Sequence, residues 1–283
     1  FYEWYNPLYT KRPLPYTGLI PADDYVDDFM APQVRELIDR YRPDFMYFDG
    51  EWDHPPLFWK SRELVAYYYN QAAARGQDVL VNDRYGKGFR GKHGDVYNVE
   101  YHFGSESEGL LDHPWSYWRG IAKTFGYNRD TRPADCLTPK ELIHMFVDGV
   151  SRNGNFDINV GPAPDGSITD VERYPLRELG KWLAVNGEAI YGARPWRTDS
   201  VGDVRFTVKD GWVYAIFLAW HGERFRIPSV TAEEGSPVTM LGVPGELAWR
   251  SENGDMVVEY PAHRPLPTEC AWAWAFKIRP REL

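Results

Sequence analysis

Hydrophobic and polar positions follow two different patterns along the 283-residue chain. In the first pattern, between residues 44 and 186, short apolar runs typical of buried strands are separated by segments with apolar residues at helical spacing. The expected strands are 44–49, 79–81, 95–101 and 156–160, and the expected helices are 23–41, 61–75, 115–124, 138–151 and 171–186. About five such alternations predict a parallel sheet with crossover helices.

The second pattern begins near residue 194, where short strands follow one another with turn residues between them. The expected strands are 204–208, 212–220, 224–227, 238–241, 247–250, 256–260 and 271–278. This spacing is typical of an antiparallel β-sandwich. We therefore expect an α/β domain over residues 1–193 and a β-sandwich domain over residues 194–283.

The α/β domain is short for a closed (β/α)8 barrel, which needs eight strands and about 250 residues. Either the sheet is open, or the chain is a partial barrel whose first three units are missing. The chain opens with FYEWYNPLY, without Met and without a signal-peptide pattern, so we expect a processed, truncated or trimmed chain, or one whose start lies elsewhere. Because an open strand edge leaves amides unpaired, we expect an oligomer contact or an upstream segment to cover it.

Composition narrows the choice of partners. The net charge of -9 argues against nucleic acid and against an anionic membrane surface, both of which attract basic patches. No apolar run is long enough to span a membrane. The two cysteines, Cys136 and Cys270, have neither disulfide-framework nor metal-site spacing. Aromatic residues make up 16% of the chain, which slightly favours carbohydrate as a ligand because aromatic rings stack on sugars.

Two carboxylates stand where parallel α/β folds place their chemistry, at the ends of strands. Asp49 ends the run DFMYFD, and Glu100 lies close to the end of DVYNVEY. A pair of acids is what glycoside hydrolysis requires, with retention of configuration at a separation of about 5–5.5 Å and inversion at a wider one. Alternatively, Asp49 caps the following helix or turn, which is the usual role of Asp after a strand. Nearby competing acids are Glu51, Asp53, Asp83 and Asp95.

Several runs resemble one known family, in the same order along the chain. They are EWYNPLY (3–9), FDGEW (48–52), VNDRYG (81–86), HGDVYNVEY (93–101), FGYNRD (125–130), GNFDINVGPAPDG (154–166), NGEAIYGARPWR (186–197), VYAIFLAW (213–220) and MLGVPGELAW (240–249). The chain resembles the family 29 glycoside hydrolases, the retaining α-L-fucosidases, and is most similar to their animal-type branch. The family's catalytic domain begins well upstream of EWYNPLY.

The resemblance implies roles for the two carboxylates. Asp49 matches the nucleophile, and Glu100 matches the acid/base of bacterial members. A second acid/base candidate in the family lies in a Pro-Trp-Glu run, which here reads Pro114-Trp115-Ser116 and lacks the glutamate. The implied reaction is a double displacement that needs neither a metal nor an organic cofactor.

The resemblance also implies sugar contacts by Arg84, Phe125, Tyr47 and Trp115. Arg84 matches an arginine near the nucleophile, although a structural ion pair with Asp83 or Asp95 would explain it equally well. Phe125 suits the methyl group of fucose. Tyr47 stands where some members have Trp, and core packing explains it as well.

The expected function is hydrolysis of terminal α-L-fucose from fucosylated glycans. A non-catalytic carbohydrate-binding or structural remnant is the alternative, and a retaining hydrolase for another sugar is a third. The residues leave linkage preference, oligomeric state and compartment open. The resemblance implies a soluble protein in a secreted, periplasmic or lysosome-like location.

Overall fold

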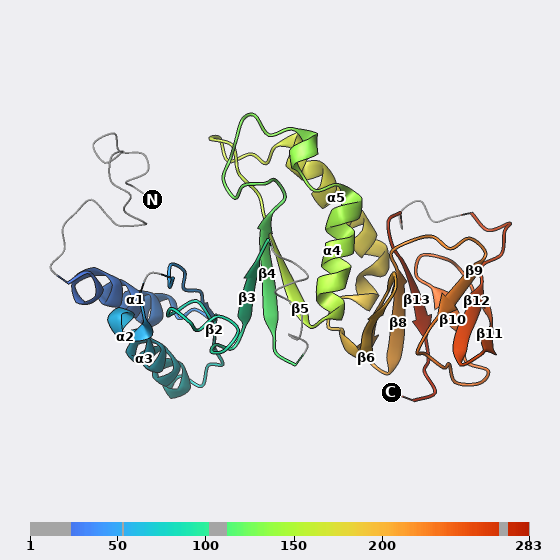
Figure 1. Cartoon of the computed structure of the whole chain (residues 1–283), viewed down its shortest axis with the longest axis horizontal. Coiled ribbons are helices and arrows are strands. Elements are labelled where there is room, and N and C mark those ends of the chain that lie inside the picture. Colours follow the sequence, from blue (N-terminus) through green and yellow to red (C-terminus); the bar gives the residue numbers. More distant parts are fainter. Residues whose placement is uncertain (1–23, 53, 102–111, 266–270, 283) are drawn as a thin grey trace. The chain divides into compact units, whose positions relative to one another are not determined.

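The computed structural model describes residues 24–52, 54–101, 112–265 and 271–282 (Figure 1). They form two compact units, the first ending at Asn98 and the second beginning at Val99. Each unit has hydrophobic clusters of its own.

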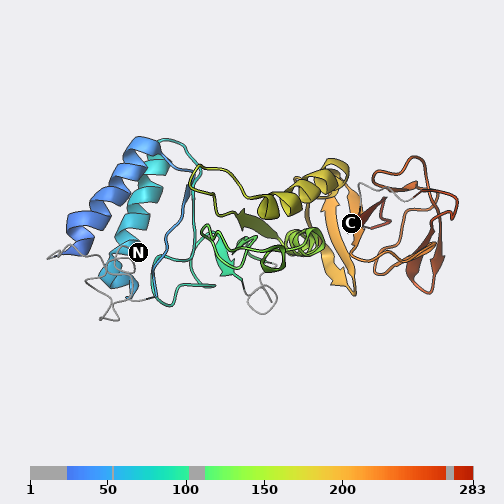
Figure 2. The same ribbon diagram turned by 90° about the horizontal axis from the view of Figure 1, so that it is seen from above.

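The first unit consists of helices packed on one face of a small parallel sheet. Its elements are η2 (Val26–Met30), α1 (Ala31–Glu36), η3 (Leu37–Tyr41), β1 (Phe45–Met46), α2 (Pro56–Trp59), α3 (Ser61–Ala74) and β2 (Leu80–Val81). β1 and β2 pair in parallel, with Phe45 opposite Leu80 and Met46 opposite Val81. Figure 2 shows α1 and α3 side by side.

Alternation along the two strands divides their side chains between the faces of the sheet. Met46 and Val81 are buried against Ile38, Val65 and Tyr68 from the helices. The other strand residues, Phe45 and Leu80, are 37% and 48% exposed. The helix expected at 23–41 is confirmed from Tyr25 onward, and Gly76 with φ +65° follows the end of α3 as expected. Ser61, expected as the cap of α3, is instead its first residue.

A three-stranded sheet with the order β3-β4-β5 begins at the boundary between the units. Its strands are β3 (Tyr97–Glu100), β4 (Trp115–Gly120) and β5 (Gly154–Asn159), and β4 pairs with β5 in parallel. The helix expected at 115–124 is therefore wrong. Trp115, Ser116 and Tyr117 are all buried, so the segment has no polar face, and its aromatic residues suit a strand better than a helix.

Two long helices cover one face of this sheet. Helix α4 (Pro139–Ser151) begins with the expected capping box, in which Thr138 and Glu141 each accept from the other's backbone N–H. Helix α5 (Asp170–Asn186) follows β5, as the sequence predicts. The short 3-10 turns η4 (Pro133–Asp135) and η5 (Gly187–Ala189) precede α4 and follow α5.

The antiparallel β-sandwich predicted for the C-terminal part is confirmed. One sheet has the order β10-β13-β8-β7-β6 and the other β11-β12-β9. The strands are β6 (Arg194–Val201), β7 (Val204–Lys209), β8 (Trp212–Phe217), β9 (Arg224–Ile227), β10 (Val238–Met240), β11 (Ala248–Glu252), β12 (Asp255–Glu259) and β13 (Trp274–Ile278). Strand β6 was not expected; its register shifts between Pro195 and Ser200.

The helices and the sandwich share one core. Leu142 and Val147 of α4 and Trp182 of α5 pack with Tyr214 and Ile216 of β8. Figure 1 shows α4 and α5 between the β3-β4-β5 sheet and the five-stranded sheet. No helix in the described ranges is both long and apolar enough to cross a membrane.

A buried ion pair joins α4 to the sandwich, and its loss should destabilise the second unit. Asp148, which is 5% exposed, accepts from Arg205 of β7 and lies near Arg152. Asp148→Ala leaves Arg205 without its carboxylate partner, whereas Arg152 keeps its ion pair with Asp199 at 3.4 Å. The unpaired cation should cost about 3–5 kcal/mol in the free energy of unfolding. Urea unfolding measures this cost. The matched control is Asp170→Ala, because Asp170 is 91% exposed in its pair with Arg173, and it should cost at most about 1 kcal/mol. Equal losses in the two variants would contradict the prediction.

His144 should make the second unit sensitive to mild acid. Its Nε2 lies 2.8 Å from the Trp272 carbonyl. Burial, aided by Lys140 and Arg205, lowers the pKa of His144 below its ordinary 6.5 despite that carbonyl. Below pH 6.5 the unfolded chain binds a proton that the folded chain does not. The free energy of unfolding therefore decreases as the pH is lowered, by at most about 1.4 kcal/mol per pH unit. His144→Gln should flatten this slope in urea unfolding between pH 7 and 5. An unchanged slope would contradict it.

Candidate active site

The carboxyl ends of β1 and β2 bring three predicted residues together in the first unit. Tyr47 and Asp49 follow Phe45 at alternate positions, so they continue the face of the strand that the helices leave uncovered. Arg84 donates from a terminal guanidinium nitrogen to Asp49 Oδ1 at 2.9 Å. The Arg84 side chain is 1% exposed, whereas that of Asp49 is 52% exposed. A buried cation therefore holds a carboxylate that solvent and ligands can reach.

Tyr47 is held beside this pair. Its hydroxyl donates to Asn98 Oδ1 at 2.9 Å, and the Arg84 guanidinium carbon lies 5.9 Å from the centre of the Tyr47 ring. Of the alternatives that the sequence left open for Arg84, the structure provides an ion pair with Asp49.

The competing acids of the first unit have other partners. Glu51 is 5% exposed and accepts from Arg90. Asp83 is 1% exposed and accepts from the backbone N–H groups of Gly91 and Asn98 at 2.8 and 3.0 Å. Burial raises the pKa of Asp83 above its usual range.

Asp95 is likewise committed to its neighbours. It accepts from the Tyr69 hydroxyl and from the backbone N–H of Val81. Asp53 lies outside the described residues. Four candidate acids lie in the described part of the first unit: Asp49, Glu51, Asp83 and Asp95. Among these four, Asp49 has a half-exposed side chain beside a buried cation.

Two further predicted residues, Glu100 and Phe125, are linked in the second unit through Tyr101, which follows Glu100 and contacts Phe125. Glu100 is the last residue of β3. The next residue, Tyr101, has φ +53°, and its ring lies 5.0 Å from that of Phe125, centre to centre. Its hydroxyl accepts from the N–H of Gly120, the last residue of β4. Phe125 is 40% exposed, which leaves part of the ring open to a ligand.

Trp115 occupies a different environment. It is 0% exposed, and its indole N–H donates to the Arg152 carbonyl at 2.8 Å. A Cβ on Gly154, its register partner, would lie 2.6 Å from the indole ring. Because the ring has no exposed face, sugar contact by Trp115 stays a prediction without structural support.

Sequence reasoning did not single out Asn82, Asn98 or Asp157. Asn82 contacts the backbone just before Asp49. Asp157 lies between Phe156 and Ile158, which pack with the helices, so it faces the other side of the sheet. Burial raises the pKa of Asp157. A polar residue within an apolar strand run, as in FDINV, is the signal that could have identified Asp157.

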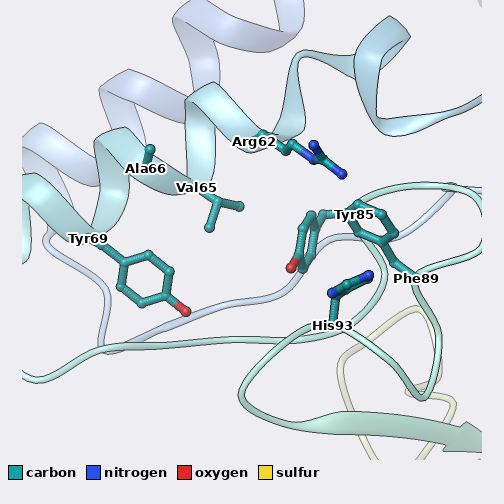
Figure 3. A pocket seen from close by; sticks show the side chains of 7 residues that line it. All are labelled: Arg62, Val65, Ala66, Tyr69, Tyr85, Phe89 and His93. Carbon is teal, nitrogen blue, oxygen red and sulfur yellow. The ribbon is translucent and has the colours of Figure 1, made fainter.

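The cavity of about 430 Å³ shown in Figure 3 is a separate feature of the first unit. Its lining residues are Arg62, Val65, Ala66, Tyr69, Tyr85, Phe89 and His93. Four of them come from α3, and the rings of Tyr85, Phe89 and His93 pack in sequence against one another. Neither Asp49 nor Arg84 lines this cavity. In the described ranges no three His, Cys, Asp or Glu side chains cluster as a metal site would require.

Comparison with known proteins identifies the family. A family model described as "Alpha-L-fucosidase" matches residues 1–188, and one described as "Alpha-L-fucosidase C-terminal domain" matches residues 198–279. The chain belongs to the alpha-L-fucosidase family. This confirms the resemblance inferred from the sequence runs.

Individual relatives agree with the family models. The chain is 35% identical to the tissue alpha-L-fucosidase of Rattus norvegicus over 96% of its own length and 59% of the relative's. The chain is 34% identical to the tissue alpha-L-fucosidase of Homo sapiens, over 98% of its own length and 59% of the relative's. The chain thus spans about 59% of the length of these alpha-L-fucosidases.

Solved alpha-fucosidase structures share the fold. The structure of Thermotoga maritima alpha-fucosidase in complex with a mechanism-based inhibitor matches with a TM-score of 0.75 and 29% identity. That match covers 91% of this chain and 57% of the other. The combination of a partial (β/α) barrel and a β-sandwich, predicted from the sequence, is therefore confirmed.

Two glycines near the site allow a paired test of backbone packing. Gly94, with φ +123°, would place a Cβ 2.9 Å from backbone atoms of Asn82 and Asp83, whereas Gly88, with φ +86°, would place one in open space. Gly88→Ala should cost about 1–2 kcal/mol of stability from its left-handed conformation alone. Gly94→Ala should cost about 2–5 kcal/mol because overpacking adds to that strain. Urea unfolding compares the two, and equal costs would contradict the close approach.

Proposed function

We propose that this protein is a retaining exo-glycosidase that releases terminal α-L-fucose from fucosylated glycans. The observation that carries the proposal is the pair formed by half-exposed Asp49 and buried Arg84 at the end of a parallel strand. Membership of the alpha-L-fucosidase family supports fucose as the sugar. The solved relative from Thermotoga maritima, which binds a mechanism-based inhibitor, supports a stepwise covalent reaction.

In the proposed first step, Asp49 attacks the anomeric carbon while protonated Glu100 gives its proton to the leaving oxygen. Arg84 orients the attacking carboxylate through its 2.9 Å hydrogen bond to Asp49 Oδ1. In the second step, ionised Glu100 takes a proton from water, which displaces Asp49 and releases fucose. Retention of configuration follows from the two displacements.

We propose that the remaining exposed groups recognise the sugar. Partly exposed Phe125 offers an apolar surface to the C5 methyl group, and Tyr47 lies beside the Arg84–Asp49 pair. Trp115 is assigned to packing because its ring is buried.

We also propose a division between a catalytic domain over 1–193 and a sandwich domain over 194–283. The start of β6 at Arg194 and the family matches over 1–188 and 198–279 support this division. The names of the tissue and plasma relatives support a lysosomal or secreted location. We further propose that an oligomer contact or a further segment covers the open edge of the β1–β2 sheet, where backbone groups would otherwise lack strand partners.

Hydrolysis of an aryl α-L-fucoside tests the proposal. The wild-type chain should release the phenol, and Asp49→Ala should lower kcat by at least about 10³-fold because the covalent step is lost. Glu100→Ala should slow hydrolysis of fucosides whose leaving group must be protonated far more than hydrolysis of a fucoside with an activated phenol as leaving group. Early NMR spectra should show α-fucose as the first product.

The control variant is Glu51→Gln, because Glu51 is buried and paired with Arg90 and has no proposed role in the chemistry. It should leave kcat within about threefold of wild type after correction for folded protein. Binding of fucose without turnover by the wild-type chain would replace the proposal with the non-catalytic carbohydrate-binding alternative. Release of β-fucose first would overturn the retaining mechanism.

A further inference from the structure

The backbone ladder between β1 and β2 ends at Met46, and a side chain replaces it at Phe48, one residue before Asp49. The last regular bonds run from Leu80 N–H to the Asp44 carbonyl at 2.9 Å and from Asn82 N–H to the Met46 carbonyl at 3.3 Å. In a regular parallel ladder, Phe48 would next bond to the backbone of residues 82 and 84.

The side-chain amide of Asn82 supplies both of these bonds instead. Phe48 N–H donates to Asn82 Oδ1 at 2.9 Å, and Asn82 Nδ2 donates to the Phe48 carbonyl at 2.7 Å. A carboxamide suits this position because it presents one acceptor and one donor, as a strand backbone does. We propose that Asn82 is a positioning residue for the nucleophile, a role that rests on the proposed function.

Asn82 is itself firmly held. It is 0% exposed, and its backbone forms a parallel bridge with Val96 on the side of the next strand. Gly94 approaches so closely that any Cβ there would lie 2.9 Å from the Asn82 carbonyl. The amide therefore projects from a fixed backbone, so it can impose its geometry on Phe48.

The position of Asp49 depends on the residue before it more than on the residue after it. Gly50 follows with φ +97° and has no atom within 4 Å of its Cβ position. Glycine in open space restrains the chain weakly. The Asp49 backbone is therefore held through Phe48 by Asn82, and its carboxylate is held by Arg84. A nucleophile displaced by about 1 Å can lose on the order of 10²-fold in rate.

The test compares three variants of the whole chain on an aryl α-L-fucoside. Asn82→Leu removes both bonds to Phe48 at similar volume, and Asn82→Asp keeps the acceptor but loses the amide donor. The matched control is Asn186→Leu, because Asn186 is another buried asparagine and donates to the Trp182 carbonyl within α5. A mechanism-based inhibitor counts the competent sites in each preparation.

We expect kcat per counted site to fall about 100-fold in Asn82→Leu, with KM within about threefold of wild type. The kcat per counted site of Asn82→Asp should lie between the values of Asn82→Leu and wild type. Asn186→Leu should unfold at lower urea but keep the wild-type kcat per site. If Asn82→Leu has fewer counted sites, each with wild-type kcat, Asn82 is structural and the inference is overturned.

A second readout does not need turnover, so failure of the proposed function leaves the inference testable. Amide exchange at Phe48 and Asp49 should be slow in the wild-type chain and in Asn186→Leu, and fast in Asn82→Leu. Equal exchange at Phe48 in all three proteins overturns the inference. An inactive wild type with the expected exchange pattern supports the positioning of Asp49 and refutes the fucosidase proposal.

Discussion

The chain between β1 and Asp49 must keep its backbone groups paired after the neighbouring strand has turned away. In this protein β2 leaves the ladder at Asn82, because the segment continues toward Val96 and the Arg84 side chain turns to Asp49. The Asn82 amide restores the missing bonds at Phe48. Unpaired backbone groups beside Asp49 would otherwise cost about 1–3 kcal/mol each. The geometry of the site depends on this substitution of side chain for backbone.

The tripeptide Asn82-Asp83-Arg84 contacts three different parts of the first unit. Asn82 holds the end of β1, Asp83 accepts from the backbone of Gly91 and Asn98, and Arg84 pairs with Asp49. Asn98 in turn accepts from the Tyr47 hydroxyl. Neighbouring acids therefore differ in role because their surroundings differ. Asp83 is enclosed by protein donors, whereas Asp49 keeps half of its side chain exposed.

The sequence was most informative where one face of an element is apolar and the other polar. Helices α4 and α5 and most sandwich strands were predicted within a few residues, since they alternate in this way. Strand β4 was mistaken for a helix because its first three residues are buried whatever their polarity. Strand β6 was not predicted, because a register shift interrupts the alternation of its side chains between the two faces. Local pattern carries no information about either condition, since both depend on what packs against the strand.

In the candidate site too, local patterns and family runs predicted some residues, whereas the roles of others depend on contacts that are distant in the sequence. Asp49 and Glu100 were predicted because strand ends are recognisable, and Arg84 and Phe125 followed from the family runs. The burial of Trp115 and the role of Asn82 depend on contacts with Arg152 and Phe48, which lie 37 and 34 residues away. No spacing rule relates such positions.

The central claim is that Asp49 is the nucleophile of a retaining fucosidase. Incubation with a 2-fluoro fucosyl donor, followed by digestion and mass spectrometry, tests it most directly, because the fluorine slows release of the covalent intermediate. We expect one fluorofucosyl group per chain, ester-linked to Asp49, and no label in Asp49→Asn. Labelling of Glu51, Asp83 or Glu100, or no covalent label on a chain that hydrolyses fucosides, would contradict the claim.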